Sequence, residues 1–147
     1  MIEPIRLSFE VACRPDHAFE VWTGRIGQWW PVDHTVSGEP GVAVVLEPRR
    51  GGRIFERTVG GVEHDWGEVT TWEPPSRFAY LWHLGRDRTD ATEVEIRFVD
   101  RGAATLVEIE HRGWEAIGTD GESWRDRNVG GWATLLPKYI AAADRVA

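Results

Sequence analysis

The sequence predicts an α+β domain in which a curved antiparallel sheet of about seven strands wraps around a long C-terminal helix. Between residues 42 and 112, short segments of alternating polar and apolar residues recur, separated by glycine, proline and polar turns. An apolar stripe at helical spacing then runs from Trp132 to Ala143. The connections between the strands are short, which favours antiparallel neighbours with one buried face and one wet face.

The N-terminal part is predicted to form one strand and then two short helices. The segment Ile5–Val11 alternates apolar and polar residues, which is the period of a half-buried strand. Pro15 suits the first turn of a helix, where its missing N–H costs nothing. Gly24 and Gly27 divide the apolar positions that follow into two short helices. Pro31 ends the segment, because the residue before a proline avoids the helical region.

The remaining strands are expected from alternation and from turn residues. Gly60-Gly61 favours a two-residue hairpin connection, in which positive φ is needed. Pro74-Pro75 closes the strand after it, and Asp100-Arg101-Gly102 turns the chain once more. The predicted strands cover residues 42–47, 53–59, 62–72, 77–84, 93–98 and 105–112.

The C-terminal helix is predicted to begin with Asn128 as its N-cap and to continue to Arg145. It would be about 27 Å long at 1.5 Å per residue. Pro137 lies inside it and is expected to remove one hydrogen bond and kink the helix. The apolar stripe that would cover the sheet comprises Trp132, Leu135, Leu136, Tyr139, Ile140 and Ala143.

Tryptophan is the residue type that says most about function. The chain has nine tryptophans and only seven leucines. Each indole can bury about 150–250 Å² and usually needs a partner for its N–H group. Packing alone is better served by Leu, Ile and Val, which carry no polar atom. We therefore expect an aromatic, incompletely filled interior that forms a ligand cavity.

Composition limits the classes of function. The net charge of −7 argues against nucleic-acid binding, because phosphates need a basic face. No apolar run approaches the ~18 residues of a membrane span, and the N-terminus lacks the pattern of a signal peptide. A single cysteine, Cys13, excludes an internal disulfide and fits a reducing compartment. We expect one cytoplasmic domain over residues 1–147, with the oligomeric state left open, a homodimer included.

Several motifs together resemble a known family. They are Trp29-Trp30-Pro31, Glu47-Pro48 with Gly51-Gly52-Arg53, Trp66-Gly67-Glu68-Val69, the segment Trp72-Glu73-Pro74-Pro75-Ser76-Arg77-Phe78, Glu110-His111-Arg112-Gly113-Trp114, and Gly130-Gly131-Trp132. With the β-α-α-β(6)-α order, they are similar to the START-like (SRPBCC) superfamily. Within it, the chain resembles the bacterial stand-alone branch named after the C-terminal domain of the activator of heat-shock-protein-90 ATPase. The resemblance implies a helix-grip fold with a cavity between sheet and helix, and no particular reaction.

The candidate ligand-binding residues are mostly aromatic side chains expected on inward faces. They are Trp29, Trp30, Glu56, Trp66, Tyr80, Trp82, His111, Trp114, Trp132, Leu136 and Tyr139. Core packing explains the aromatic rings as well as cavity lining does. His111 ends a strand facing inward, where a hydrogen-bonded core histidine is the commoner case than a ligand or a proton-transfer group.

Glu56 and Arg57 are adjacent in a predicted strand and therefore point to opposite faces. Whichever faces inward is a buried charge that needs a partner, and Arg53 or Arg112 could pair with it. The sequence does not decide between the two. Trp114 and Trp124 are expected in a loop before the last helix, where a lid would lie.

No metal or cofactor is expected. His64 and Asp65 are adjacent in a strand, so they cannot bind one ion together, and no second pair stands at ligand spacing. The glycine pairs are turn residues rather than phosphate cradles, and no Gly-x-Ser-x-Gly motif occurs. A nucleophilic Cys13 has no nearby histidine motif to support it.

Three classes of function remain. The favoured one is a domain that binds a small hydrophobic molecule, aromatic or lipid-like, between sheet and helix. The second is a polyketide cyclase/aromatase-like enzyme, in which His111 or a buried glutamate moves protons. The third is a protein-interaction module acting on a chaperone or another partner, which would need an exposed apolar patch.

Overall fold

The computed structural model describes residues 2–145 of the chain. In chain order the elements are β1 (Ile5–Val11), α1 (Pro15–Thr23), β2 (Ala43–Leu46), β3 (Arg53–Arg57), β4 (Glu63–Glu73), β5 (Arg77–Trp82), β6 (Thr92–Arg101), β7 (Ala104–Arg112) and α2 (Gly121–Asp144). Short 3₁₀ helices lie at Ile26–Gln28, Val32–His34, Arg88–Asp90 and Trp114–Asp120. None of the helices in this part of the chain is long and apolar enough to cross a membrane.

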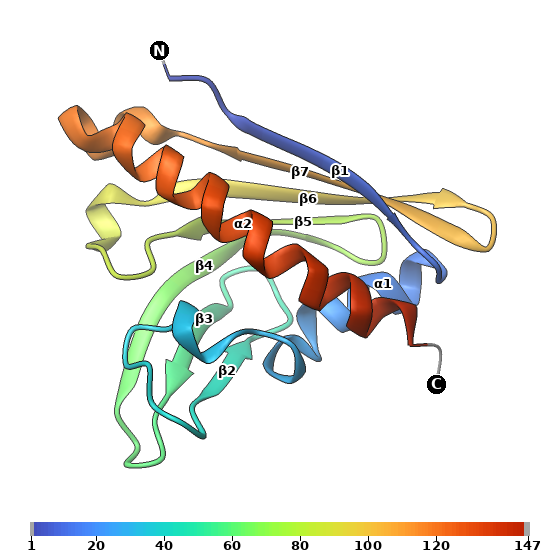
Figure 1. Cartoon of the computed structure of the whole chain (residues 1–147), viewed down its shortest axis with the longest axis horizontal. Coiled ribbons are helices and arrows are strands. Elements are labelled where there is room, and N and C mark those ends of the chain that lie inside the picture. The colour runs from blue at the N-terminus through green and yellow to red at the C-terminus, as the bar shows by residue number, and fades with distance from the viewer. Residues whose placement is uncertain (1, 146–147) are drawn as a thin grey trace.

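The strands of residues 2–145 form one antiparallel sheet in the order β1-β7-β6-β5-β4-β3-β2. Its β2–β4 side curls forward, and α2 crosses the concave face from end to end (Figure 1). The predicted α+β class, with a curved sheet around a long C-terminal helix, is confirmed.

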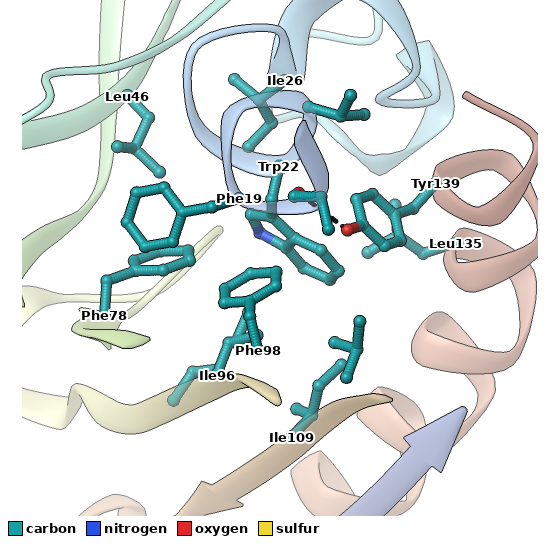
Figure 2. Packing of buried hydrophobic residues seen from close by; sticks show 14 of the residues in the cluster. Phe19, Trp22, Ile26, Leu46, Phe78, Ile96, Phe98, Ile109, Leu135 and Tyr139 are labelled. Carbon is teal, nitrogen blue, oxygen red and sulfur yellow. Dashed lines mark hydrogen bonds between the residues drawn. The ribbon is translucent and has the colours of Figure 1, made fainter. Parts of the chain in front are cut away.

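Helix α1 fills the space at one end of the concave face. Its Phe19 and Trp22 lie between the sheet, represented by Phe78 and Phe98, and the second half of α2 (Figure 2). The Trp22 ring lies 4.5 Å from that of Tyr139, centroid to centroid. The Tyr139 hydroxyl donates to the carbonyl oxygen of Ala18 at 2.8 Å. This end of the interior is therefore closely packed core.

A β-bulge in β4 sets the curvature next to β3. Ile54 is opposite Gly67 and Phe55 is opposite Asp65, so Trp66 is the extra residue of the bulge. The Trp66 side chain is fully buried. A Cβ on Gly67 would stand 1.9 Å from the carbonyl oxygen of Leu81 on β5. Glycine is therefore required where the bulged strand approaches its neighbour.

Substituting Gly67→Ala is expected to destabilise the protein by about 3 kcal/mol or more, because a backbone atom of a paired strand cannot move away cheaply. Gly130→Ala is the matched control. A Cβ there meets open space, and alanine is the better helix former, so a gain of up to about 1 kcal/mol is expected. Urea unfolding followed by tryptophan fluorescence measures both. Equal stability of the two variants would refute the argument.

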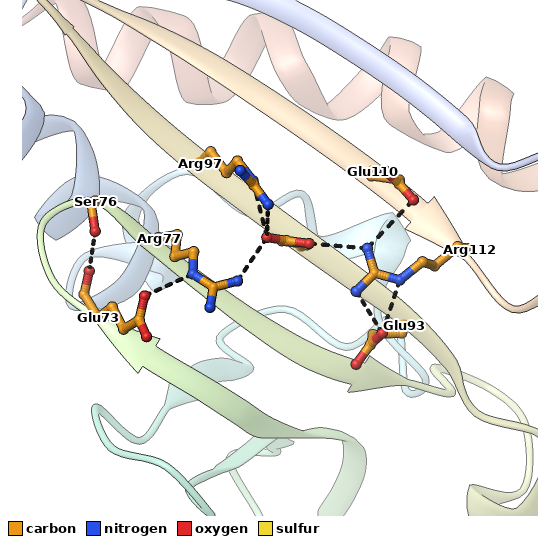
Figure 3. Close-up of polar contacts among 8 residues, drawn as sticks. Glu73, Ser76, Arg77, Glu93, Arg97, Glu110 and Arg112 are labelled. Carbon is orange, nitrogen blue, oxygen red and sulfur yellow. Dashed lines mark hydrogen bonds and ion pairs between the residues drawn. The ribbon is translucent and has the colours of Figure 1, made fainter.

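The convex face of the sheet is covered by a network of ion pairs. The Glu95 carboxylate accepts hydrogen bonds from Arg77 at 2.9 Å, from Arg97 at 3.0 Å and from Arg112 at 3.1 Å (Figure 3). Burial opposes ionisation of Glu95, but these three arginines hold its pKa below the usual range. The charged groups of this network are therefore paired with one another.

The structure corrects three details of the sequence prediction. Helix α2 begins at Gly121 rather than near Asn128, so Asn128 lies inside it. Trp124 is consequently helical rather than part of a loop, whereas Trp114 lies in a 3₁₀ helix and is fully buried. The β3–β4 connection comprises residues 58–62, because the Thr58 N–H donates to Val62 O and closes a longer turn.

Candidate functional site

A cavity of about 150 Å³ lies between the sheet and the first half of α2. The sheet side is formed by Tyr80 and Trp82 of β5 and by Leu84 after it. The loops contribute Trp30, His34 and Arg86. The helix side is formed by Trp124, Arg127, Asn128, Gly131, Trp132 and Leu135. We call this space the cavity from here on.

Aromatic rings form most of the cavity wall. The Trp30 ring lies 5.8 Å from that of Trp82, which in turn lies 5.6 Å from the ring of Tyr80. Trp66 supports this wall from behind, with its ring 5.1 Å from Trp30 and 5.8 Å from Trp82. Ring separations of this size are typical of favourable edge-to-face and offset packing. The wall therefore consists of rings whose positions fix one another.

His111 connects the two sides of the cavity without lining it. The Trp132 indole N–H donates to His111 Nδ1 at 3.2 Å, and His111 Nε2 lies 2.7 Å from Thr92 Oγ1. The Thr92 hydroxyl is 3.2 Å from the carbonyl oxygen of Trp82. His111 thus links α2 to strands β5, β6 and β7.

The indole partner determines the protonation state of His111. An indole N–H can only donate, so Nδ1 must be the acceptor and the ring proton is on Nε2, from which it is donated to Thr92. Burial lowers the pKa of His111 to about 3, and the charge of Arg86 acts in the same direction. His111 is therefore a neutral, fully hydrogen-bonded ring that positions Trp132 and the backbone of Trp82.

Glu56 is the inward-facing member of the pair Glu56 and Arg57, and its side chain is fully buried. Its Oε1 accepts from the Val36 N–H at 2.5 Å and from the Trp66 indole at 2.8 Å, and its Oε2 accepts from the Ser37 N–H at 3.0 Å. Arg57 points outward to Glu63. Neither Arg53 nor Arg112 is its partner, since Arg53 binds Glu63 and Asp65, and Arg112 binds Glu93 and Glu95.

The charge of Glu56 is maintained by these N–H groups. Burial is the largest single influence and raises the pKa, but the three hydrogen bonds prevail and lower it. The carboxylate therefore fastens the segment that carries His34 to the sheet, and it fixes the indole behind the cavity wall.

The polar groups that face the cavity are few. The Tyr80 side chain is buried, and burial alone raises the pKa of its hydroxyl, which makes no hydrogen bond to another residue of the described chain. Arg86 donates to the carbonyl oxygens of Trp82 and Asp90. The Asn128 side-chain amide donates to Trp124 O at 2.8 Å.

Four of the eleven candidate residues line the cavity, namely Trp30, Tyr80, Trp82 and Trp132. Glu56, Trp66, His111 and Trp114 lie behind the wall, where Trp114 donates to the carbonyl oxygen of His111 at 3.0 Å. Trp29 and Tyr139 belong to the packed core beside α1, and Leu136 is the half-buried neighbour of the lining residue Leu135. Which of these residues contact a ligand stays a prediction.

The sequence analysis missed most of the helix side of the cavity. Trp124, Asn128, Gly131 and Leu135 stand at i, i+4, i+7 and i+11, which is one face of a helix. Only the helical spacing from Trp132 back to Trp124, eight residues earlier, marks this face, because the residues between them are mostly polar or glycine and extend no apolar stripe. No comparable signal marks His34, Leu84 or Arg86, which come from irregular segments.

Two other kinds of site considered from the sequence are a metal site and a nucleophilic Cys13. No group of three or more His, Cys, Asp or Glu residues within residues 2–145 is arranged to hold a metal ion. Cys13 is buried, and its pKa is raised to about 11, first by burial and then by the charges of Asp144 and Asp16. It is therefore a protonated core residue rather than a nucleophile.

Comparison with known proteins agrees with this architecture. The sequence model of the family described as activator of Hsp90 ATPase homolog 1-like proteins matches residues 12–143. No curated protein sequence matches the chain significantly. Protein MLL2253 from Mesorhizobium loti shares the fold, with a TM-score of 0.72 and 17% identity over 99% of both chains.

Two further solved structures belong to proteins with a named function. The anthrahydroquino-γ-pyrone synthase Txn09 is 33% identical, with a TM-score of 0.59, over 83% of this chain and 84% of that one. The self-sacrificing resistance protein CalC from Micromonospora echinospora is 26% identical, with a TM-score of 0.71, over 96% of this chain and 94% of that one. The helix-grip fold of the START-like superfamily is thereby shown.

Proposed function

Because the chain belongs to the family of activator of Hsp90 ATPase homolog 1-like proteins, we propose that it acts through the cavity its helix-grip fold encloses, by binding a small aromatic molecule. The observation that carries the proposal is the aromatic wall of Trp30, Tyr80, Trp82 and Trp132, which face one space from three different segments. Ligand sites commonly combine such apolar walls with a few polar groups.

The volume of the cavity limits the size of the ligand. An apolar cavity of about 150 Å³ is large enough for benzene, whereas drug-sized ligands need about 300–1,000 Å³. At about 150 Å³, the cavity fits one aromatic ring or the end of a larger aromatic system. The free Tyr80 hydroxyl can donate a hydrogen bond to a polar substituent on that ring.

The test is calorimetric titration of the protein with toluene, phenol and indole, with tryptophan fluorescence as a second readout. Gly131→Phe should abolish binding, because Gly131 lines the cavity and a side chain there meets only open space. Gly130→Phe is the matched control, since its neighbouring position on the same helix is exposed and equally open. If none of the three compounds binds, or if both variants bind alike, the proposal is wrong.

The identity to Txn09 favours a second candidate, the closure of a ring on an aromatic precursor. Among the lining residues, His34 and Tyr80 are the side chains that could exchange a proton with a ligand. Chromatography and NMR of the recovered ligand separate the two functions, because a binding protein returns its ligand unchanged, whereas ring closure gives a different structure even where no water is lost and the mass stays the same.

A further inference from the structure

The charged residues of the cavity are all of one sign. Arg86 and Arg127 are among the lining residues, and no Asp or Glu is. The chain as a whole is acidic, with 24 Asp and Glu residues against 17 Lys and Arg residues. A basic opening in an acidic protein therefore needs an explanation of its own.

Arg86 is half-buried but forms no ion pair within residues 2–145. Its guanidinium group is held by the carbonyl oxygens of Trp82 and Asp90. Burial lowers its pKa, which the more distant charge of Asp90 only partly offsets. The half-buried Arg112, by contrast, contacts the carboxylates of Glu93 and Glu95. Arg86 is thus a partly desolvated cation whose position is fixed and whose charge has no carboxylate beside it.

Arg127 and Arg86 both lie against the ring of Trp124. The Arg86 guanidinium lies 5.1 Å from the Trp124 ring centroid, and that of Arg127 lies 4.7 Å from it. Arg86 comes from the β5–β6 connection and the other two residues from the first half of α2, which face each other in Figure 1. Two cations gathered on one ring repel each other, and an anion between them would relieve that repulsion.

We propose that the ligand of the cavity is an aromatic acid, whose ring lies against Trp30, Trp82 and Trp132 and whose anionic group is bound by Arg86 and Arg127. This rests on the proposed function and narrows it. Guanidinium groups bind carboxylates through charge-assisted hydrogen bonds, which are stronger than neutral ones. Arg127 is exposed, so the anionic group would lie at the open side of the cavity.

Benzoate and benzamide test the proposal, because they have the same ring and nearly the same shape and differ in charge. By calorimetry at pH 8, wild-type protein should bind benzoate about tenfold more tightly or better, which is the usual advantage of a charged partner. Raising the salt concentration should weaken binding of benzoate and leave benzamide unchanged.

Arginine variants test which side chains cause the preference for benzoate. Arg127→Gln should reduce the preference for benzoate, and Arg127→Glu should reverse it, without harm to the fold because Arg127 is exposed. Arg101→Gln is the control, since Arg101 is equally exposed and lies at the far end of β6. Arg86→Gln should also lose the preference, with circular dichroism and urea unfolding to confirm that the variant remains folded.

The outcomes separate this inference from the function beneath it. Equal affinity for benzoate and benzamide overturns the inference while leaving the binding function intact. A preference that survives both Arg127→Glu and Arg86→Gln overturns it as well, and the two arginines are then merely stacked on Trp124. If toluene and phenol bind but benzoate does not, the ligand is neutral. If no aromatic compound binds, the proposed function itself fails.

Discussion

Lowering the pH from 6.5 to 4.5 is expected to reduce the unfolding free energy by about 1.4 kcal/mol per pH unit through His111 alone. The pKa of His111 is about 3 in the folded protein, against 6.5 for an unperturbed histidine. In this window the unfolded chain binds a proton that the folded protein does not. The stabilisation by His111 is therefore complete above pH 6.5 and is lost as the pH falls toward 3.

Urea unfolding at half-unit steps of pH measures this dependence. Glu56, Glu63 and Glu95, whose pKa values are lowered in the folded protein, add to the loss of stability as the pH approaches 4.5, so a comparison variant is needed to isolate the contribution of His111. His111→Gln is the comparison, because glutamine can accept from Trp132 and donate to Thr92 without titrating. The unfolding free energy of this variant should fall less steeply with decreasing pH than that of the wild type. The difference should be about 1.4 kcal/mol per pH unit, which corresponds to the uptake of one proton. A wild-type stability that stays level between pH 6.5 and 4.5 would contradict the assignment.

Substituting Glu56→Ala is expected to destabilise the protein by about 3–5 kcal/mol, because three N–H groups at a buried position would lose their acceptor. Glu56→Gln should cost less than Glu56→Ala, since its amide retains one oxygen but directs an N–H group at another donor. Urea unfolding gives the magnitude. Tryptophan fluorescence should change as well, because Trp66 loses its indole partner.

Glu10→Gln is the control for the glutamine variant. Glu10 is exposed on β1, so the same chemical change there should leave the stability nearly unaltered. If Glu56→Gln were as stable as Glu10→Gln, the carboxylate would not be what holds the segment around Val36 and Ser37.

The strands could be predicted from the sequence because alternation is the direct result of burying one face of a sheet. β1 agrees with the prediction at both ends, and the other strands differ by a few residues. The start of α2 could not be predicted in this way. Between Gly121 and Arg127 the helix carries mostly polar residues, and Trp124 is the one large apolar side chain that it packs there. A helix without a continuous apolar stripe gives no periodic signal.

The orientation of Glu56 was undetermined for a related reason. Ile54 and Phe55 are adjacent, and both are buried, so the pattern of β3 does not reveal which face is the inner one. Phe55 proves to lie on the outer face, with the guanidinium groups of Arg53 and Arg57 4.1 Å and 5.3 Å from its ring centroid. The stems of long arginine side chains can bury an aromatic ring at the surface, which residue types alone do not indicate.

The two hydrogen bonds that Glu56 accepts from the N–H groups of Val36 and Ser37 also bear on access to the cavity. Residues 31–42, which include His34 of the cavity wall, form no strand. Their backbone is held to the rest of the protein by the two hydrogen bonds that Glu56 accepts and by the Trp30 indole N–H, which donates to the His34 carbonyl oxygen at 3.1 Å. A segment with so few backbone hydrogen bonds is expected to open at a lower free-energy cost than the paired strands of the sheet. Loss of the Glu56 carboxylate would therefore loosen this side of the cavity first, and a ligand could enter there without unfolding of the sheet.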